Sequence, residues 1–422
     1  MDNDHDSSAT SSLAETWPSS RLSGSKLRPD SAVMNRDNGE KEGQAEEPVA
    51  RGEVVLSGGT QSLHFDAAKL LRRQPVIAYG EEARRLIFNK RVLVTGAGGS
   101  IGSELIRQLD VLQPEKLFLL DHDESLMHSL QLEVFGDGQL DHERTILADI
   151  RDQRRLSNLF CEVRPDLIFH AAAHKHLAIL ERYPSEAVRT NVAGTENVIR
   201  ASQNCGAERL TFVSTDKAAD PTSVLGATKR IAEVLVHQGA TRGLRTASVR
   251  FGNVLGSRGS FLHTLAYQLR AGIPVTVTHP LAERFFMSIP EAAALVIEAS
   301  VQASRGETYV LDMGTPVRIL ELMDRFLESN DLPAPEVRYT GLVPGEKLSE
   351  RLFDTSEVRL KTKHPRIWQV PAVDERWSSL ERLEQLYFEA ALANEEAVRR
   401  ELWACAEAPG SETCLDPQER TA

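Results

Sequence analysis

Arg91-Val-Leu-Val-Thr-Gly-Ala-Gly-Gly-Ser-Ile-Gly102 joins a short apolar strand to three glycines in the spacing Thr-Gly-x-x-Gly-x-x-Gly. We expect Gly96 to permit the tight turn after the strand, Gly99 to let the backbone approach a pyrophosphate, and Gly102 to let the next helix pack closely. Because glycine trios also occur in flexible loops, the assignment of a phosphate-binding turn depends on the residues around it.

The residues that follow favour a dinucleotide site. A helix predicted to open at Ser100 would point its N-terminus at the anion, with Ser100 and Ile101 beside it. One helix later, the apolar strand Lys116–Leu120 is followed by Asp121, where a carboxylate would meet the adenosine ribose hydroxyls. Since an acidic residue there disfavours a 2′-phosphate, the pattern predicts NAD rather than NADP as the cofactor.

The composition is that of a globular chain with an acidic balance. Its 422 residues are 41% hydrophobic, enough for one large domain or two moderate ones. The formal net charge of -12 argues against a nucleic-acid partner, because phosphate backbones require basic faces. The cysteines lie far apart without Cys-x-x-Cys pairing, which favours reduced thiols over a disulfide frame or a metal site. They are Cys161, Cys205, Cys405 and Cys414.

Neither a membrane span nor a signal peptide is predicted. No run approaches the ~18 apolar residues that a bilayer span requires, and the N-terminus is polar and acidic where a signal peptide would have a basic segment and an apolar core. We therefore expect a soluble, cytoplasmic protein. A homo-oligomer is expected as well.

The chain divides into five predicted parts. Residues 1–50 are polar without an apolar period and are expected to be disordered, and residues 51–89 look like a lead-in arm. From residue 90 strands and helices alternate, which is typical of a parallel sheet covered on both faces. We predict an α/β fold with a Rossmann-type doubly wound sheet in 90–255, a smaller substrate-binding lobe in 256–371, and helices with a frayed tail in 372–422.

Six strands of the sheet are expected at Val92–Val94, Leu117–Leu120, Arg144–Leu147, Leu167–Phe169, Leu210–Val213 and Thr246–Arg250. After the third strand, Asp149 and Ile150 are expected to border the adenine. After the fourth strand, Ala171 is one of several small residues that would let the dinucleotide lie close. The three histidines of His170–His176 do not predict a metal site, because the segment has no carboxylate or thiol at ligand spacing.

The fifth strand delivers a carboxylate and an amine, Asp216 and Lys217, to the edge of the sheet where α/β folds bind ligands. Because the chain turns at a strand end, both side chains can reach one ligand, although on these two residues alone a surface salt bridge is the simpler interpretation. In the next helix, Leu225 and Lys229 share one face at i and i+4. This arrangement favours a functional site.

Eight short segments of the sequence match motifs of a known family and occur in the same order along the chain. They are Thr95–Glu104, His170–His176, Asn191–Gly194, Ser214–Ala218, Gly226–Lys229, Arg250–Gly259, Arg284–Met287 and Gly345–Leu348. The chain resembles the extended short-chain dehydrogenase/reductases. It is more closely similar to the bacterial polysaccharide-biosynthesis nucleotide-sugar dehydratases, typified by UDP-N-acetylglucosamine 4,6-dehydratase. So many phrases in one order are far more specific than the glycine motif alone.

The resemblance implies a redox cycle in which NAD is recycled. Hydride leaves C4 of the sugar, water is eliminated across C5 and C6, and the same hydride returns to C6. The resemblance assigns Lys217 as the base at C5, Asp216 as the acid at the departing 6-hydroxyl and Lys229 as the ligand of the nicotinamide ribose. Lys217 is then expected to be partly neutral, in a buried site beside the nicotinamide cation.

Two departures from the family pattern matter. The broader superfamily has Tyr-x-x-x-Lys, and Leu225 stands in the place of the tyrosine. Large membrane-bound members of the dehydratase family also have a non-tyrosine residue there, so Leu225 marks a subfamily; a decayed, inactive protein is the alternative. The 4-hydroxyl proton is then expected to go to Thr215, or to a water held by Thr215 and Lys229. Those large members also carry N-terminal transmembrane helices and an extra domain, where this chain has only polar residues.

The resemblance makes a UDP-sugar the expected substrate, either UDP-N-acetylglucosamine or a related UDP-hexose. Asn253 and Arg258 are expected to meet its diphosphate, since guanidinium groups bind such oxyanions in a bidentate manner. Lys175, Arg284 and Glu346 are further expected substrate ligands. Two alternatives stay open. A nucleotide-sugar C4-epimerase needs neither acid nor base at C5, and a silent protein would bind NAD and UDP-sugar without turnover.

Overall fold

The computed structural model describes residues 51–54, 63–136, 142–240, 243–372 and 380–406. The described residues group into one compact unit. The predicted disorder of residues 1–50 and the predicted fraying of the C-terminal tail, which includes Cys414, concern residues outside these ranges.

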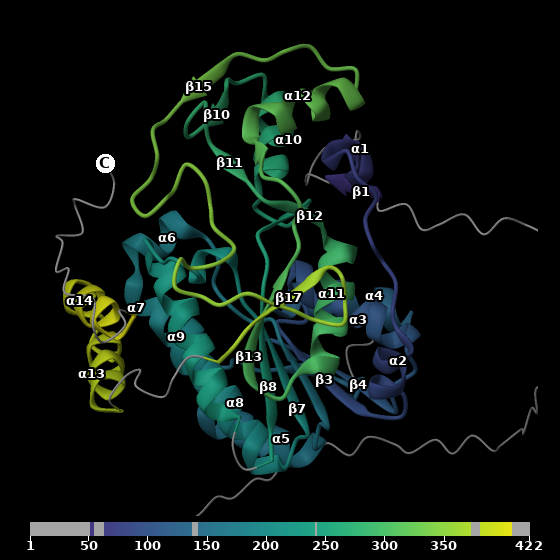
Figure 1. Ribbon diagram of the computed structural model, residues 1–422, viewed down its shortest axis with the longest axis vertical. Helices are drawn as coiled ribbons and strands as arrows, with labels where there is room; N and C mark the ends of the chain where they lie inside the picture. The colour runs from purple at the N-terminus through teal and green to yellow at the C-terminus, as the bar shows by residue number, and fades with distance from the viewer. Residues whose placement is uncertain (1–50, 55–62, 137–141, 241–242, 373–379, 407–422) are drawn as a thin grey trace, which may run out of the picture. The chain divides into compact units, whose positions relative to one another are not determined.

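A nine-stranded sheet forms the centre of the described unit (Figure 1). Its strands are β3 (Arg91–Thr95), β4 (Lys116–Asp121), β5 (Thr145–Leu147), β6 (Leu167–His170), β7 (Arg209–Val213), β8 (Arg245–Arg250), β13 (Arg305–Leu311), β16 (Leu360–Lys361) and β17 (Ile367–Val370). Their order is β16-β17-β13-β8-β7-β6-β3-β4-β5. The strands from β13 to β5 run parallel, whereas β17 pairs antiparallel with both β13 and β16. All six predicted strands are present, so the predicted α/β class is confirmed.

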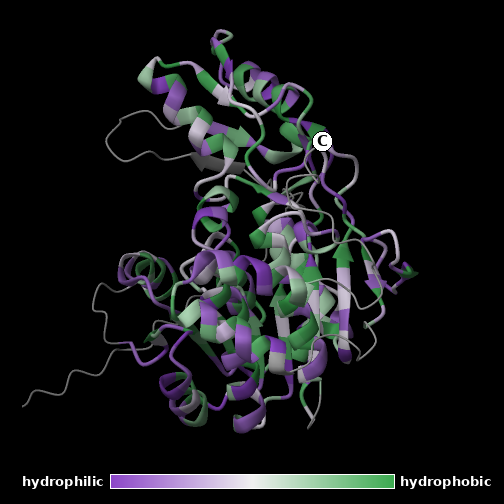
Figure 2. Ribbon diagram, turned by 90° about the vertical axis from the view of Figure 1, so that its left-hand side faces the viewer, coloured by the Kyte–Doolittle hydropathy of each residue, from purple (hydrophilic) through white to green (hydrophobic). Residues whose placement is uncertain are grey.

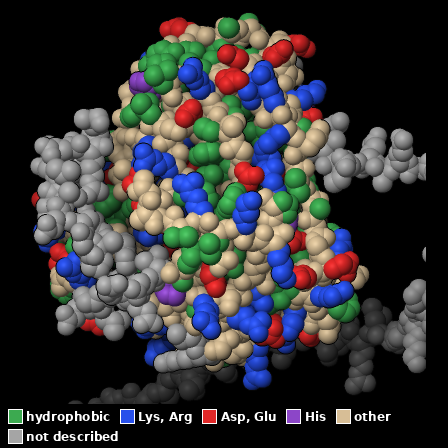
Figure 3. All heavy atoms as spheres, in the orientation of Figure 1, with side chains coloured by type: hydrophobic (Ala, Val, Ile, Leu, Met, Phe, Trp, Pro, Cys, Tyr) green, Lys and Arg blue, Asp and Glu red, His purple; other side chains and the backbone are tan. Residues whose placement is uncertain are grey.

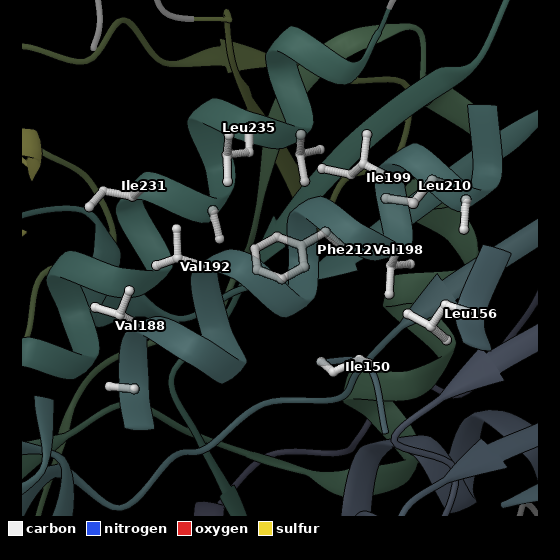
Figure 4. Packing of buried hydrophobic residues seen from close by; sticks show 14 of the residues in the cluster. Ile150, Leu156, Val188, Val192, Val198, Ile199, Leu210, Phe212, Ile231 and Leu235 are labelled. Carbon is white, nitrogen blue, oxygen red and sulfur yellow. The ribbon is translucent and has the colours of Figure 1, made fainter. Parts of the chain in front are cut away.

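Helices cover both faces of the sheet. One face carries α2 (Glu81–Ile87), α3 (Ser100–Val111), α4 (Glu124–Phe135) and α11 (Ile289–Gln302), and the other carries α5 (Gln153–Val163), α8 (Gly194–Cys205) and α9 (Val224–Gly239). Side chains of a strand alternate between faces, so Val92 and Val94 pack into the first layer and Leu93 into the second. Figure 4 shows the second layer, with Phe212 among the apolar side chains of the helices. In Figure 2 the helices carry both apolar and polar residues, as expected for helices that cover a sheet.

The order of the strands reverses at β3, which pairs with β4 on one side and with β6 on the other. The connection after β3 leads to β4 on one side, whereas the chain after β5 crosses to β6 on the other side, and a crevice opens at the carboxyl ends of these strands. This reversal places the glycine turn after β3 next to the loop after β6.

A second group of elements forms the lobe. It contains β9 (Asn253–Leu255), α10 (Phe261–Ala271), β10 (Val275–Val277), β11 (Glu283–Arg284), β12 (Phe286–Ser288), β14 (Val317–Arg318), α12 (Ile319–Ser329) and β15 (Val337–Tyr339). The strands form the pairs β9 with β12, β10 with β15, and β11 with β14. Residues from the predicted arm join this core, because Phe65 and Leu70 pack with Phe326. Phe65 lies in β2 (Leu63–Asp66), which pairs with β1 (Arg51–Val54), and Leu70 lies in α1 (Ala67–Leu71).

The structure corrects the expectation of an unbroken lobe from 256 to 371. After α11, the chain returns to the main sheet as β13, which pairs in parallel with β8. The edge strands β17 and β16 follow in the same sheet. The physical reason is burial: Tyr309, Val310 and Leu311 are apolar on both sides of the strand and are almost fully buried there.

The C-terminal residues form a helical hairpin of α13 (Leu380–Ala391) and α14 (Glu395–Ala406), close to the predicted helices. The hairpin packs against α9, α7 (Pro184–Ala187) and the π-helix η1 (Val188–Ala193), as the yellow segment beside α9 in Figure 1 indicates. Leu386, Val398 and Leu402 are fully buried in the core layer over the sheet. The hairpin is therefore part of the second core layer.

Two surface properties bear on the sequence predictions. Among the described residues, no helix has the length and apolarity that crossing a bilayer demands. On the face shown in Figure 3, Lys and Arg side chains are interspersed with Asp and Glu side chains.

Candidate active site

The glycine turn joins β3 to α3 at the point where the strand order reverses. Gly96 has φ 69°, and a Cβ atom there would lie 2.5 Å from the backbone nitrogen of Ala172. Only glycine fits this approach between the turn and the loop after β6. The N-cap of α3 is Gly99, and no described side chain caps the helix. The first-turn N–H groups of Ser100, Ile101 and Gly102 are therefore available to an anion.

A pocket of about 210 Å³ lies beside this turn. Its lining brings together six residues that the sequence analysis assigned to the cofactor: Gly96, Gly99, Asp121, Asp149, Ile150 and Ala171. These residues follow β3, β4, β5 and β6, so the pocket extends along the carboxyl ends of adjacent strands. Its place at the carboxyl ends of these strands, next to the uncapped N-terminus of α3, fits a dinucleotide.

Asp121 supports the turn as well as lining the pocket. Its carboxylate accepts hydrogen bonds from the backbone nitrogens of Gly98 (2.9 Å), His122 (2.7 Å) and Asp123 (3.1 Å). The side chain is 7% exposed. Asp121 thus holds the glycine turn in place, and its expected contact with a ribose stays a prediction.

His170, the last residue of β6, is the histidine of the segment His170–His176 that lies deepest in the protein. Its ring lies between the hydroxyls of Thr95 (2.7 Å) and Thr195 (3.0 Å). Burial, with the nearby charge of Lys229, lowers the pKa of His170 to about 3, so the ring is neutral. No group of three or more metal-ligating side chains occurs within the described ranges.

Thr215, Asp216 and Lys217 form one hydrogen-bonded group after β7. Asp216 opens the short 3-10 helix η2 (Asp216–Ala218), and its Oδ1 atom accepts hydrogen bonds from the Thr215 hydroxyl (2.9 Å) and from Lys217 Nζ (3.0 Å). Asp216 is 1% exposed. The surface salt bridge, the simpler interpretation from the sequence, is therefore wrong. The three residues with predicted chemical roles lie in direct contact.

Sequence reasoning missed Glu350. Its Oε1 atom lies 3.5 Å from Lys217 Nζ, and its side chain is 3% exposed. The residue comes four positions after Glu346, just beyond the matching phrase Gly345–Leu348. Extending that matching phrase by two residues would have included Glu350.

The charge state of Lys217 differs from the expectation. Burial alone would lower the pKa of Lys217, but the carboxylates of Asp216 and Glu350 outweigh burial and raise this pKa above its ordinary value. The positive charge of Arg284 opposes them only in part. The two carboxylates therefore favour the ammonium form of Lys217, in contrast to the partly neutral amine expected beside a nicotinamide cation.

Lys229 and Leu225 lie one turn apart near the start of α9, as expected. Lys229 Nζ donates a hydrogen bond to the carbonyl oxygen of Val213 (2.6 Å) and lies 4.0 Å from the centroid of the Phe212 ring. Leu225 is buried within the apolar core. The expected contact of Lys229 with a nicotinamide ribose stays a prediction.

The substrate ligands expected from the sequence separate into two groups. Arg284 on β11 pairs with Glu346 at 2.6 Å, and its positive charge acts on the pKa of Lys217. Arg258 instead lies on the glycine turn. Its guanidinium donates to the carbonyl of Gly98 and its backbone nitrogen donates to the Ser100 hydroxyl (3.1 Å). Two cationic side chains thus lie in different parts of the crevice.

Lys175 and Asn253 complete the expected set. Lys175 Nζ donates to the carbonyl oxygen of Arg258 at 2.7 Å, and burial followed by the charge of Arg258 lowers the pKa of Lys175. Asn253 opens β9, and its backbone nitrogen donates to the carbonyl of Phe285. Lys175 is therefore grouped with Arg258, on the side of the glycine turn.

The doubly wound sheet, the glycine turn at its reversal and the buried acid and amine after β7 together define an extended short-chain dehydrogenase/reductase. The sequence profile of a known family matches residues 92–372, and the chain belongs to that family, described as polysaccharide biosynthesis protein.

Individual proteins agree with this membership. The probable polysaccharide biosynthesis protein EpsC of Bacillus subtilis is 42% identical over 322 residues, which are 75% of this chain and 54% of EpsC. The chain thus spans about half the length of that relative. The X-ray structure of Pen from Bacillus thuringiensis matches with a TM-score of 0.62 and 31% identity, over 68% of this chain and 89% of Pen. DesIV of Streptomyces venezuelae, a dTDP-glucose 4,6-dehydratase solved with NAD and TYD bound, shares the fold, with a TM-score of 0.55 and 22% identity over 63% of this chain and 88% of DesIV.

Proposed function

We propose that this chain is an NAD-dependent nucleotide-sugar 4,6-dehydratase that acts on UDP-N-acetylglucosamine or a related UDP-hexose. The observation that carries the proposal is the contact of the buried carboxyl group of Asp216 with the largely buried amine of Lys217, after the strand next to β6, whose loop lines the pocket. Elimination of water beside a ketone needs one base and one acid close together, which this pair provides. Membership of the polysaccharide biosynthesis family supports a nucleotide-sugar substrate.

The residues of the crevice fit NAD. Gly96 lets the backbone of the loop after β6 approach the turn closely, and α3 offers uncapped N–H groups to a pyrophosphate. Asp121 lines the pocket with a carboxylate, which disfavours a 2′-phosphate, whereas Asp149 is paired with Arg151, which also lines the pocket, at 2.6 Å. When bound, NAD accepts the hydride from C4 of the sugar and donates it to C6.

The chain's own residues move the protons. The Thr215 hydroxyl takes the proton of the sugar 4-hydroxyl as it passes its own proton to Asp216 Oδ1, 2.9 Å away. Asp216 then holds the proton that the departing 6-hydroxyl requires. Lys217 accepts the proton of C5, which the neighbouring C4 ketone has made acidic. This relay gives the missing tyrosine a substitute, because Leu225 can neither accept nor donate a proton.

Product analysis on a panel of UDP- and dTDP-hexoses tests the activity. The expected product is lighter than the substrate by one water, and substrate deuterated at C4 gives product with deuterium at C6. Lys217→Ala should lower turnover at least ~100-fold while NAD still binds, because a general base contributes on that scale. An epimerised sugar of unchanged mass would replace the proposal with the C4-epimerase alternative.

A further inference from the structure

In the proposed reaction Lys217 has to be a neutral amine to act as the base at C5. Its neighbouring carboxylates favour the protonated, ammonium form instead. The charged side chains that act on Lys217 come from three elements: Asp216 on η2, Glu350 on the segment 345–350 and Arg284 on β11. If Asp216 receives its proton from the sugar through Thr215, it is no longer free to take one from Lys217. The other carboxyl group in reach is Glu350, at 3.5 Å.

Segment 345–350 is fixed on the side of the lobe. Ser349 pairs with Glu283 of β11 in a parallel bridge, and the backbone nitrogen of Glu283 donates to the carbonyl of Leu348 at 2.9 Å. The guanidinium of Arg284 donates to the same carbonyl oxygen at 2.9 Å. These ties hold the backbone next to Glu350 at a set distance from the active site.

The same segment is also tied to the loop between η2 and α9. Lys347 Nζ lies 3.1 Å from the carboxylate of Asp220, and the Thr222 hydroxyl donates to the carbonyl of Gly345 at 3.1 Å. Gly345 has φ 76°, and a Cβ atom there would lie 2.7 Å from Ser223 Cβ. Glu350 is therefore held from two sides, and its approach to Lys217 does not depend on a flexible surface loop.

The local charges leave one negative charge in excess. Lys217 is the cation between two buried carboxyl groups, Asp216 and Glu350. The next cation, Arg284, is paired with Glu346 at 2.6 Å. Moreover, Asp216 Oδ2 is buried and lacks a hydrogen-bond partner among the described residues. Two buried carboxyl groups around one amine form a unit that readily holds an additional proton.

We propose that Glu350 is the proton partner of Lys217: it takes the proton of the ammonium ion before the C5 proton is removed, and it returns that proton after the cycle. Glu350 acts through Lys217 and is thus a positioning residue for the proton. The inference rests on the proposed dehydratase function.

The protons balance through the cycle. An Nζ–H bond of Lys217 breaks and an O–H bond forms on Glu350, which leaves an amine and a carboxylic acid. The amine takes the C5 proton, Asp216 gives its proton to the departing 6-hydroxyl, and water leaves. Lys217 then returns a proton to C5 when hydride is delivered to C6. Glu350 finally returns its proton to the amine, and the resting ammonium ion is restored.

The first test measures the proton of Lys217 without any turnover. Competitive labelling of Lys217 with acetic anhydride, followed by mass spectrometry across pH, reports its apparent pKa in the protein without sugar. Glu350→Gln should lower that pKa, because one of two negative neighbours is removed. Glu283→Gln is the matched control: it removes a carboxylate from the same region of the lobe, and the labelling profile should stay that of the wild type.

The second test measures turnover against pH. Glu350→Gln should lower kcat by at least ~10-fold with KM changed less than ~2-fold, and it should change the pH profile of kcat, because the path of the lysine proton is lost. Glu350→Asp keeps the carboxyl group and should restore part of kcat. If Glu350→Gln does not fold, the partial loss of kcat expected in Glu350→Asp serves as the test.

The outcomes separate the two proposals. An unshifted labelling profile in Glu350→Gln, or a wild-type pH profile of kcat in that variant, overturns the role of Glu350. A wild-type chain that dehydrates none of the nucleotide sugars overturns the proposed function. In that case the labelling profile alone still decides whether Glu350 sets the protonation of Lys217.

Discussion

Lys229 Nζ lies 2.6 Å from the carbonyl oxygen of Val213, the last residue of β7. The hydrogen bond ties α9 to the strand end from which Thr215 and Asp216 follow. Burial lowers the pKa of Lys229 to about 7 and outweighs the opposing charge of Glu233. A lysine with a pKa near 7 changes its charge within the range where proteins are usually assayed.

The lowered pKa of Lys229 predicts a pH dependence of stability. The unfolded chain holds this proton up to its ordinary pKa of 10.5, whereas the folded chain releases it near pH 7. The burial of the charge therefore destabilises the fold fully below pH 7, and this destabilisation is relieved as pH rises from 7 toward 10.5. Between pH 6 and 9, the free energy of unfolding of the wild type should rise relative to that of Lys229→Met in denaturant titrations. Parallel pH dependences of the two proteins would contradict the assignment.

Asp121→Ala should weaken both the cofactor site and the turn. The carboxylate accepts three backbone N–H groups, among them that of Gly98, and these lose their partner in the variant. An unpaired buried donor costs about 1–3 kcal/mol, and the bond from Gly98 is buried, so the melting temperature should fall along with NAD affinity measured by calorimetry. Asp121→Asn keeps an acceptor oxygen and should lose less stability. Unchanged NAD affinity in Asp121→Ala would exclude a role in binding.

The sequence predicted the part of the site that is local. Strand ends of a parallel sheet meet at one edge, so Gly96 and Asp121 are brought together by the order of the strands alone. The contact of Lys217 with Glu350 depends instead on how the lobe folds back, which no local pattern encodes. The pKa of Lys217 is raised first by Asp216 and then by Glu350, and only the second of these neighbours was missed in the sequence. The return of β13 to the sheet was missed because its strand pattern lies inside a region of short mixed elements.

The C-terminal hairpin should stabilise the start of α9. Arg399 on α14 binds the carboxylate of Glu181 at 2.6 Å, and the other oxygen of Glu181 accepts the backbone N–H of Val224, the first residue of α9, at 2.6 Å. Arg399→Met removes a charge-assisted bond and should lower the free energy of unfolding by about 1–3 kcal/mol. Arg400→Met is the matched control, because Arg400 is largely exposed and its ion pair with Glu401 contributes little. Equal melting temperatures of the two variants would exclude this role.

Leu225→Tyr tests whether the chain is active without the superfamily's tyrosine. Leu225 is 6% exposed and packs in the apolar core, so the larger ring should strain the start of α9 by about 1–3 kcal/mol. We expect the wild type to dehydrate its sugar and the variant to be less active and less stable, because in the proposed reaction the Thr215 relay removes the 4-hydroxyl proton. Leu225→Met should stay near wild type in both respects, since it conserves volume. Turnover by Leu225→Tyr on a nucleotide sugar that the wild type leaves unchanged would establish instead that the wild type is a silent binding protein.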